Sequence, residues 1–252
     1  MIRREYDLPV WALAACLRWD NLGEGHPVFA ETPLWRNEQA ERELDEATRD
    51  ELARCGLLEA TGRVDPDFRD TLIVLTRPGT EFSCWAKHTE GSYRMLVAAI
   101  GRDTVLLTRV DEQVRFRPAR PETPAEELVA QLPELGPAKA HAVNVPRSAY
   151  DELLNPTNTG IVHRRGGDPD AKRLYNILDQ PRLHTAELHA ATRDRSGMRK
   201  RARQATVLDT EQGRWLISLK PGGQPGDDWI VTAPATPQLL ASTLYEMRDN
   251  PR

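Results

Sequence analysis

The sequence predicts an α+β fold, in which an antiparallel sheet is flanked by helices and two β-β-β-β-α halves are related by a pseudo-twofold arrangement. Three observations lead to this prediction. The chain of 252 residues begins with helical periodicity, changes to alternating periodicity after Gly79, and repeats an order of four strands and one helix in its last third. Short turns separate the successive strands, which requires antiparallel neighbours.

The amino-terminal quarter is predicted to be mostly helical. From Asp7 or Leu8 onward, apolar residues recur with a 3.6-residue spacing as far as Leu17. A second helix is expected at residues 38–55, and it ends where Gly56 permits a left-handed cap. This second helix is rich in Glu, Arg and Ala, so we expect it to be half exposed.

A third helix is delimited at both ends by residues typical of helix boundaries. Asp65 is suited to cap it, Pro66 is suited to its first turn, and the segment from Arg77 to Gly79 ends it. Alternation then predicts strands at residues 80–88, 92–100, 104–109 and 113–117. Thr123 as a cap and Pro124 in the first turn begin the helix that follows these strands.

The last third repeats this order. Strands are predicted at residues 183–193, 198–209, 214–220 and 229–233, and Thr236 and Pro237 then begin a helix. Between the halves we expect a strand at 140–145, helices at 146–154 and 171–178, and a mobile polar loop at 155–170. We interpret residues 1–252 as a single domain with a helical part at 7–78, a first half at 79–133, a connector at 134–182 and a second half at 183–252.

Composition excludes several classes of protein. The formal net charge is −4, which argues against nonspecific nucleic-acid binding by the whole surface. Cys16, Cys55 and Cys84 are widely spaced and odd in number, so neither a disulfide framework nor a zinc site is indicated. No signal peptide and no apolar run of about 20 residues is recognisable. We therefore expect a soluble, cytosolic protein with no metal or other cofactor.

Several segments, taken in order, resemble one family. They are residues 56–58, 62–66, 95–101, 209–215 and 229–235. Their order and spacing resemble the EspG family, the cytosolic chaperones of ESX (type VII) secretion. The resemblance implies a quasi-twofold α+β fold whose sheet and helices grip the helical tip of a secreted partner, which is a PE–PPE heterodimer for the mycobacterial members.

The resemblance also implies a difference in the partner. In the mycobacterial members the loop between the first two strands of the first half is long and reaches the partner. Here that loop spans only about Thr89 to Ser92. A smaller partner, such as a WXG100-type helical hairpin or a PPE-like protein of a related actinobacterium, would fit this shorter loop.

Two other classes of function are weighed against the chaperone. Arg199, Arg201 and Arg203 alternate on one predicted strand face, which suits an acidic partner or solvent, and less well the phosphates of a nucleic acid. His184 and His189 are five residues apart on a strand, so they face opposite sides and share no metal. Motifs of hydrolases and phosphate loops are absent, and we predict no enzyme. A hydrolase or transferase with a site assembled in space remains the alternative.

The activity predicted from these features is binding in a groove. We expect an exposed, concave sheet face and the helix at 236–247 to receive apolar residues from the end of a partner's helical hairpin, with arginines at the rim. No catalytic residue is predicted. The candidate partner-binding residues are Trp85, His88, Tyr93, Arg199, Arg201, Arg203, Trp215, Leu240 and Leu244.

Overall fold

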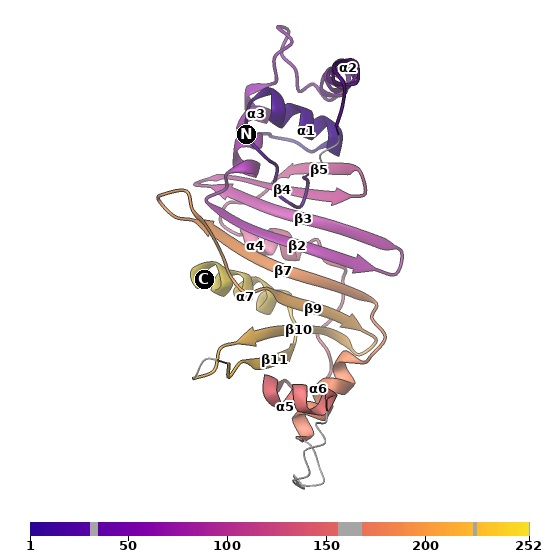
Figure 1. Cartoon of the computed structure of the whole chain (residues 1–252), viewed down its shortest axis with the longest axis vertical. Coiled ribbons are helices and arrows are strands. Elements are labelled where there is room, and N and C mark those ends of the chain that lie inside the picture. The colour runs from indigo at the N-terminus through magenta and orange to yellow at the C-terminus, as the bar shows by residue number, and fades with distance from the viewer. Residues whose placement is uncertain (31–34, 156–167, 224–225, 252) are drawn as a thin grey trace.

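A single antiparallel sheet runs through the whole molecule, which is seen in a computed structural model that describes residues 1–30, 35–155, 168–223 and 226–251 (Figure 1). Its strands are β1 (Tyr6–Pro9), β2 (Thr80–His88), β3 (Gly91–Ile100), β4 (Asp103–Val110), β5 (Gln113–Pro118), β6 (Val143–Pro146), β7 (His184–Arg193), β8 (Arg199–Arg201), β9 (Ala205–Thr210), β10 (Gly213–Lys220) and β11 (Trp229–Pro234). The helices are α1 (Val10–Trp19), α2 (Glu38–Cys55), α3 (Pro66–Thr76), α4 (Pro124–Val129), α5 (Arg147–Leu154), α6 (Pro169–Leu178) and α7 (Pro237–Asp249).

The strand order in space confirms the predicted fold class. The sheet reads β1-β5-β4-β3-β2-β7-β9-β10-β11-β6, and β8 pairs with β7 beside β9. This order is a palindrome, because β1 corresponds to β6 and β5-β4-β3-β2 corresponds to β11-β10-β9-β7. The nine residue pairs between β2 and β7 have Cys84 and Leu188 in their middle, so the quasi-twofold axis passes beside this pair.

The repeat is longer than the sequence predicts. Residues before the first four strands form β1, α1, α2 and α3, and residues before the second set form β6, α5 and α6. Pro9 and Pro146 each end an edge strand and directly precede a helix. The amino-terminal helical part and the connector at 134–182 are therefore corresponding parts of the two halves.

Backbone hydrogen bonds at the strand ends match between the halves. Three such bonds of the first half each have a counterpart at the same place in the second half, so the duplication extends to local geometry. The bond from the Gly79 N–H to the Ala99 carbonyl (2.9 Å) matches the bond from Leu183 to Asp209 (2.9 Å). The bond from Ala119 to Thr104 (3.1 Å) matches the bond from Ala235 to Arg214 (2.9 Å). The bond from Val10 to Glu112 (2.9 Å) matches the bond from Arg147 to Asp228 (2.8 Å).

Most predicted element boundaries are confirmed to within a few residues. The helix α2 begins and ends as predicted, Gly56 has the left-handed φ of 68°, and only Thr48 and Leu52 of this helix are buried. Asp65 caps α3 by accepting a hydrogen bond from the Phe68 N–H at 3.0 Å. The predicted loop at 155–170 lies mostly outside the described residues.

Two predictions of secondary structure are wrong. Asp7 and Leu8 belong to the short edge strand β1, where Leu8 pairs with Val114, and the helix begins only at Val10. The strand predicted at 198–209 is divided into β8 and β9. Arg201 pairs with Ala191 and residue 205 with residue 188, so three residues of one strand face two of β7, which is a β-bulge.

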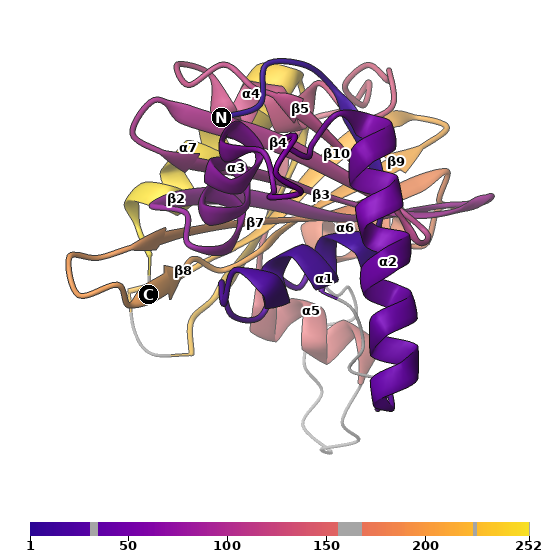
Figure 2. The same cartoon turned by 90° about the horizontal axis from the view of Figure 1, so that it is seen from above.

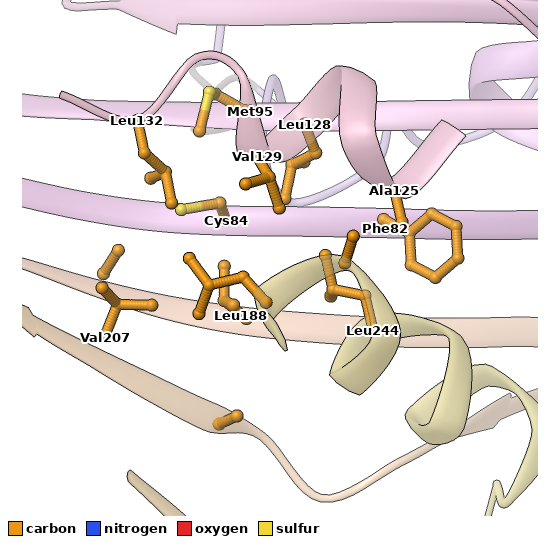
Figure 3. Packing of buried hydrophobic residues seen from close by; sticks show 14 of the residues in the cluster. Phe82, Cys84, Met95, Ala125, Leu128, Val129, Leu132, Leu188, Val207 and Leu244 are labelled. Carbon is orange, nitrogen blue, oxygen red and sulfur yellow. The ribbon is translucent and has the colours of Figure 1, made fainter. Parts of the chain in front are cut away.

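The two faces of the sheet are covered differently. On one face α4 and α7 lie over β2, β3 and β7 and bury a central core, in which Leu128 of α4 and Leu244 of α7 point toward Phe82, Cys84 and Leu188 (Figure 3). On the other face, the group of α1, α2 and α3 packs over β3, β4 and β5 (Figure 2). On the same face, α5 and α6 pack near β9 and β10. None of the described helices is long and apolar enough to cross a membrane.

Candidate partner-binding surface

The middle of the sheet is left uncovered on the side opposite α4 and α7. Figure 1 shows β2, β7 and β9 bare between the α1 and α3 group at one end and the α5 and α6 group at the other. Because side chains alternate along a strand, the residues of β2 and β7 that do not enter the central core face this side. We call this surface the open face, and it comprises Trp85, Glu187, His189, Arg199 and Arg201, together with Glu81 and Ser83, which are themselves buried.

A cavity of about 250 Å³ lies on the open face at the quasi-twofold axis. We call it the axis pocket. Trp85 and His189 form its floor with ring centroids 4.8 Å apart and planes at 81°. These two residues directly follow Cys84 and Leu188, so they occupy corresponding positions in the two halves. The volume is sufficient for one or two side chains of a partner.

One wall of the axis pocket is a buried ion cluster. Glu81 is only 3% exposed, and its Oε1 accepts a hydrogen bond from Arg199 Nε at 2.8 Å. His26 Nδ1 accepts the Val28 N–H at 3.2 Å, and its Nε2 lies 3.3 Å from Glu81 Oε1 and 3.0 Å from Arg199 Nη2. Burial alone would raise the pKa of Glu81, but the hydrogen bonds from His26 and Arg199 lower it to about 2.

The cluster joins three segments that are far apart in the sequence. Arg199 comes from β8, Glu81 from β2, and His26 from the connection between α1 and α2. That connection is also held by Arg109 of β4, whose Nη1 donates to the Ala30 carbonyl at 3.1 Å. Arg199 therefore stabilises the fold, and its charge is already neutralised before any partner binds.

The sequence-predicted residues divide into three groups in the structure. Trp85, Arg199 and Arg201 lie on the open face. Arg203 instead lines a separate cavity together with residues of α7, and it forms an ion pair with Asp228 at 2.8 Å. The remaining five residues lie elsewhere in the fold.

His88 and Tyr93 lie next to the β2–β3 turn, on the side of the central core. Their ring centroids are 6.3 Å apart, and the Tyr93 hydroxyl lies 3.0 Å from His184 Nε2. Burial is the main cause that raises the pKa of Tyr93. Neither residue faces the axis pocket.

Trp215, Leu240 and Leu244 are fully buried, which corrects their prediction as contacts of a partner. Trp215 packs under α5 and α6, whereas Leu240 and Leu244 pack in the central core. The apolar stripe of α7 is therefore used by the fold, and α7 covers the face opposite the open face (Figure 2). A cavity of about 390 Å³ lies between the sheet and α7, with Arg203, Leu219 and Met247 in its lining, but Leu240 and Leu244 do not line it.

Ser83, Glu187 and His189 line the axis pocket but were not predicted. Their contribution depends on the pairing of β2 with β7, which the alternation within each strand does not specify. Once Trp85 is assigned to the open face, the register places Glu187 directly opposite it and His189 opposite Ser83. These residues could have been found by matching the two halves of the sequence and then including the positions that pair beside Trp85.

A second buried polar network lies away from the open face. Arg214 donates hydrogen bonds to both carboxylate oxygens of Asp209 at 2.7 Å, and His184 Nδ1 lies 3.2 Å from Asp209 Oδ2. Burial alone would raise the pKa of Asp209, but these hydrogen bonds lower it. His184 and His189 face opposite sides of β7, as predicted. Over the described ranges, no group of three or more His, Cys, Asp or Glu residues could hold a metal ion.

Comparison with known proteins identifies the family. The model of the EspG family matches residues 9–246. No curated protein matches the chain. A solved structure of the Mycobacterium tuberculosis type VII secretion system chaperone EspG5, in complex with a PE25–PPE41 dimer, has a TM-score of 0.68 and 16% identity, with 98% of each chain covered. At this identity the structural likeness establishes the fold. Because the family model extends over nearly the whole chain, this protein belongs to the EspG family.

Proposed function

We propose that the protein is a cytosolic chaperone of type VII secretion that binds the end of a helical hairpin from a secreted protein on its open face. The observation that carries the proposal is the uncovered centre of the sheet in a member of the EspG family (Figure 1). The structurally similar EspG5 is in complex with a PE25–PPE41 dimer. A PE/PPE-like pair or a WXG100-like protein is the class of partner that we propose.

The open face supports docking without rearrangement of the fold. Its counterpart on the other side of the sheet is filled by α4 and α7, so a partner there would have to displace core residues. Trp85 is half buried at the floor of the axis pocket, and Arg201 lies at its edge. Tryptophan and arginine are enriched among the residues that dominate binding energy at interfaces. These two residues are therefore the proposed anchors.

The turns at the two ends of β2 and β7 favour a partner that reaches the centre of the sheet. His88 pairs with Gly91, so the β2–β3 connection is a two-residue turn that adds little surface. The β7–β8 connection at residues 194–198 is longer and lies beside Arg199. A short partner tip that enters between the helical groups fits this arrangement.

We propose that binding, with no covalent bond made or broken, is the whole activity of the protein. We also propose that the chain acts as one domain, because a single sheet carries both halves. The alternative of a small hydrolase or transferase would need a nucleophile and a base in contact with a cavity. In the axis pocket, Ser83 pairs across the strands with His189, but the His189 ring lies against Trp85 at 4.8 Å. Glu81 is buried and paired with Arg199, so the side of the axis pocket that these residues form stabilises the fold and supplies no catalytic base.

Co-expression tests the proposal. The protein is produced together with the PE, PPE or WXG100-like proteins encoded beside it, and complexes are separated by size-exclusion chromatography. We expect a stable complex that Trp85→Ala weakens by about 2 kcal/mol or more, as at interface hot spots. Trp35→Ala is the matched control, because Trp35 is 90% exposed outside the open face. Failure of every such pair to form a complex would refute the function.

A further inference from the structure

We propose that the axis pocket determines the direction in which a helical hairpin binds. In this proposal Arg201 contacts the carboxyl-terminal end of the hairpin's first helix, and Glu187 contacts the amino-terminal end of its second helix. The inference rests on the proposed function and assigns an orientation to the partner at the same site.

The first observation is that these two side chains carry the unneutralised charges of the axis pocket. Glu81 and Arg199, which also line it, form an ion pair with each other. Arg201 has no hydrogen-bond or ion-pair partner among the residues that the structure describes. Glu187 has only His189, at 3.8 Å.

His189 does not neutralise Glu187 near neutral pH. Burial is the main cause that lowers the pKa of His189, Glu187 opposes this shift, and the nearby Arg201, Arg199 and His26 add to it. The ring is therefore mostly uncharged at pH 7, since the ordinary pKa of histidine is about 6.5. Within the described ranges, Glu187 therefore has no positively charged partner at pH 7, and Arg201 has no negatively charged one.

The second observation is that the two charges lie at opposite ends of the axis pocket. Arg201 pairs with Ala191, which is four residues beyond Glu187 on β7. At about 3.3 Å per residue, this separates the two positions by roughly 13 Å along the strand. His189 lies between these two positions on β7, and its ring contacts that of Trp85, which pairs directly with Glu187. The pocket is therefore electrically asymmetric even though its backbone is nearly twofold symmetric.

The end of a helical hairpin has a matching asymmetry. The last carbonyl groups of its first helix carry a partial negative charge, and the first N–H groups of its second helix carry a partial positive charge. Packed helix axes are about 8–10 Å apart, and the side chains of Arg201 and Glu187 can span the small remaining difference. Only one orientation places opposite charges together, because the reversed hairpin puts like charges in contact.

Charge reversal tests this inference. We would measure the affinity of the complex that wild-type protein forms with its co-expressed partner, and compare Arg201→Glu, Glu187→Arg and the double variant. Each single reversal should weaken binding about 3- to 30-fold, since it removes one favourable helix-end interaction and adds an unfavourable one. The double variant keeps the net charge but reverses the asymmetry, so its affinity should be no better than that of the weaker single variant.

Several outcomes would overturn the inference. Recovery of wild-type affinity in the double variant would mean that only the net charge of the protein matters. The control variants Arg102→Glu and Glu134→Arg make the same charge changes at exposed positions outside the pocket. An equal loss of affinity in these controls would lead to the same conclusion. Single variants that bind like wild type would also contradict it, and the proposed function would then stand. If wild-type protein forms no complex at all, the proposed function fails and this inference fails with it. Circular dichroism checks that every variant is folded.

Discussion

The two halves of the molecule share a backbone but differ in the side chains that they bring to the quasi-twofold axis. Trp85 of the first half lies against His189 of the second at corresponding positions. Next to the axis, Ser83 of the first half corresponds to Glu187 of the second. The comparison teaches that a duplicated scaffold can be maintained by backbone hydrogen bonds while its central surface becomes asymmetric.

The corresponding hairpins differ as well. The β2–β3 turn has two residues, whereas the β7–β8 tip spans residues 194–198 and is followed by the bulge at 202–204. Asp194 shapes this tip by accepting hydrogen bonds from the N–H groups of Ser196 (3.0 Å) and Met198 (3.1 Å). The longer hairpin brings Arg199 and Arg201 to the open face, and the first half has no counterpart of these charges.

The helices that pack on the two halves of the sheet also differ. This difference predicts the largest effect of a single substitution on the free energy of unfolding. Val105 and Trp215 occupy the same place in the two halves, since each pairs on one side with a proline, Pro118 or Pro234. Trp215→Ala should lower the free energy of unfolding by about 3–5 kcal/mol, because a large side chain is removed from a buried site. Val105→Ala removes a smaller group and should cost clearly less.

Chemical denaturation of both variants measures this pair of effects. Hydrogen exchange should show the loss in Trp215→Ala concentrated in α5 and α6, which rest on Trp215. If Trp215→Ala left the stability unchanged but abolished partner binding, the result would instead show that Trp215 belongs to the binding surface.

The second prediction concerns acid stability and the ion cluster that joins the halves. The pKa of Glu81 is lowered to about 2, so its contribution to stability is complete above the unfolded value of about 4.3 and is lost as the pH falls from there toward 2. The difference corresponds to about 3 kcal/mol. Glu81→Gln should be less stable by roughly this amount at pH 7 and should show a flatter loss of stability in acid.

Urea denaturation at a series of pH values checks the Glu81 prediction. The matched control is Thr185→Val, because Thr185 is the counterpart of Glu81 in the second half and is half buried. Parallel acid profiles for wild type and Glu81→Gln would contradict the assignment, since they would show that Glu81 is not the group that titrates.

The smallest effect is predicted at the corresponding helix caps. Thr236 accepts a hydrogen bond from the Leu239 N–H at 3.2 Å, whereas the buried hydroxyl of Thr123 has no partner among the described residues. Thr236→Ala should therefore cost about 1 kcal/mol, and Thr123→Ala should be close to neutral. Thermal unfolding of the two variants distinguishes them, and an equal cost would mean that Thr123 also caps its helix.

Features with a local physical cause could be predicted from the sequence. Asp65 and Pro66 mark the start of α3 because a cap and a proline act within one turn. The alternation in β2 is likewise local, and the structure has this strand at the predicted residues. The paired Thr-Pro signals led to the duplicated architecture, although they did not show how far the repeat extends.

Features that depend on contacts between distant segments could not be predicted. The apolar stripe of α7 has the same pattern whether it packs in a core or binds a partner, so Leu240 and Leu244 were assigned to the wrong surface. The bulge after Arg201 depends on the register with β7, and the strand sequence alone read as continuous. The axis pocket needs the pairing of β2 with β7, which no local pattern encodes.

Site-specific photo-crosslinking in the purified complex tests the central claim most directly. A photoreactive amino acid would replace Lys87, which is exposed on β2, or Ser242, which is exposed on α7. Binding on the open face predicts a crosslink to the partner from position 87 and none from position 242. A crosslink from position 242 with none from position 87 would contradict the account.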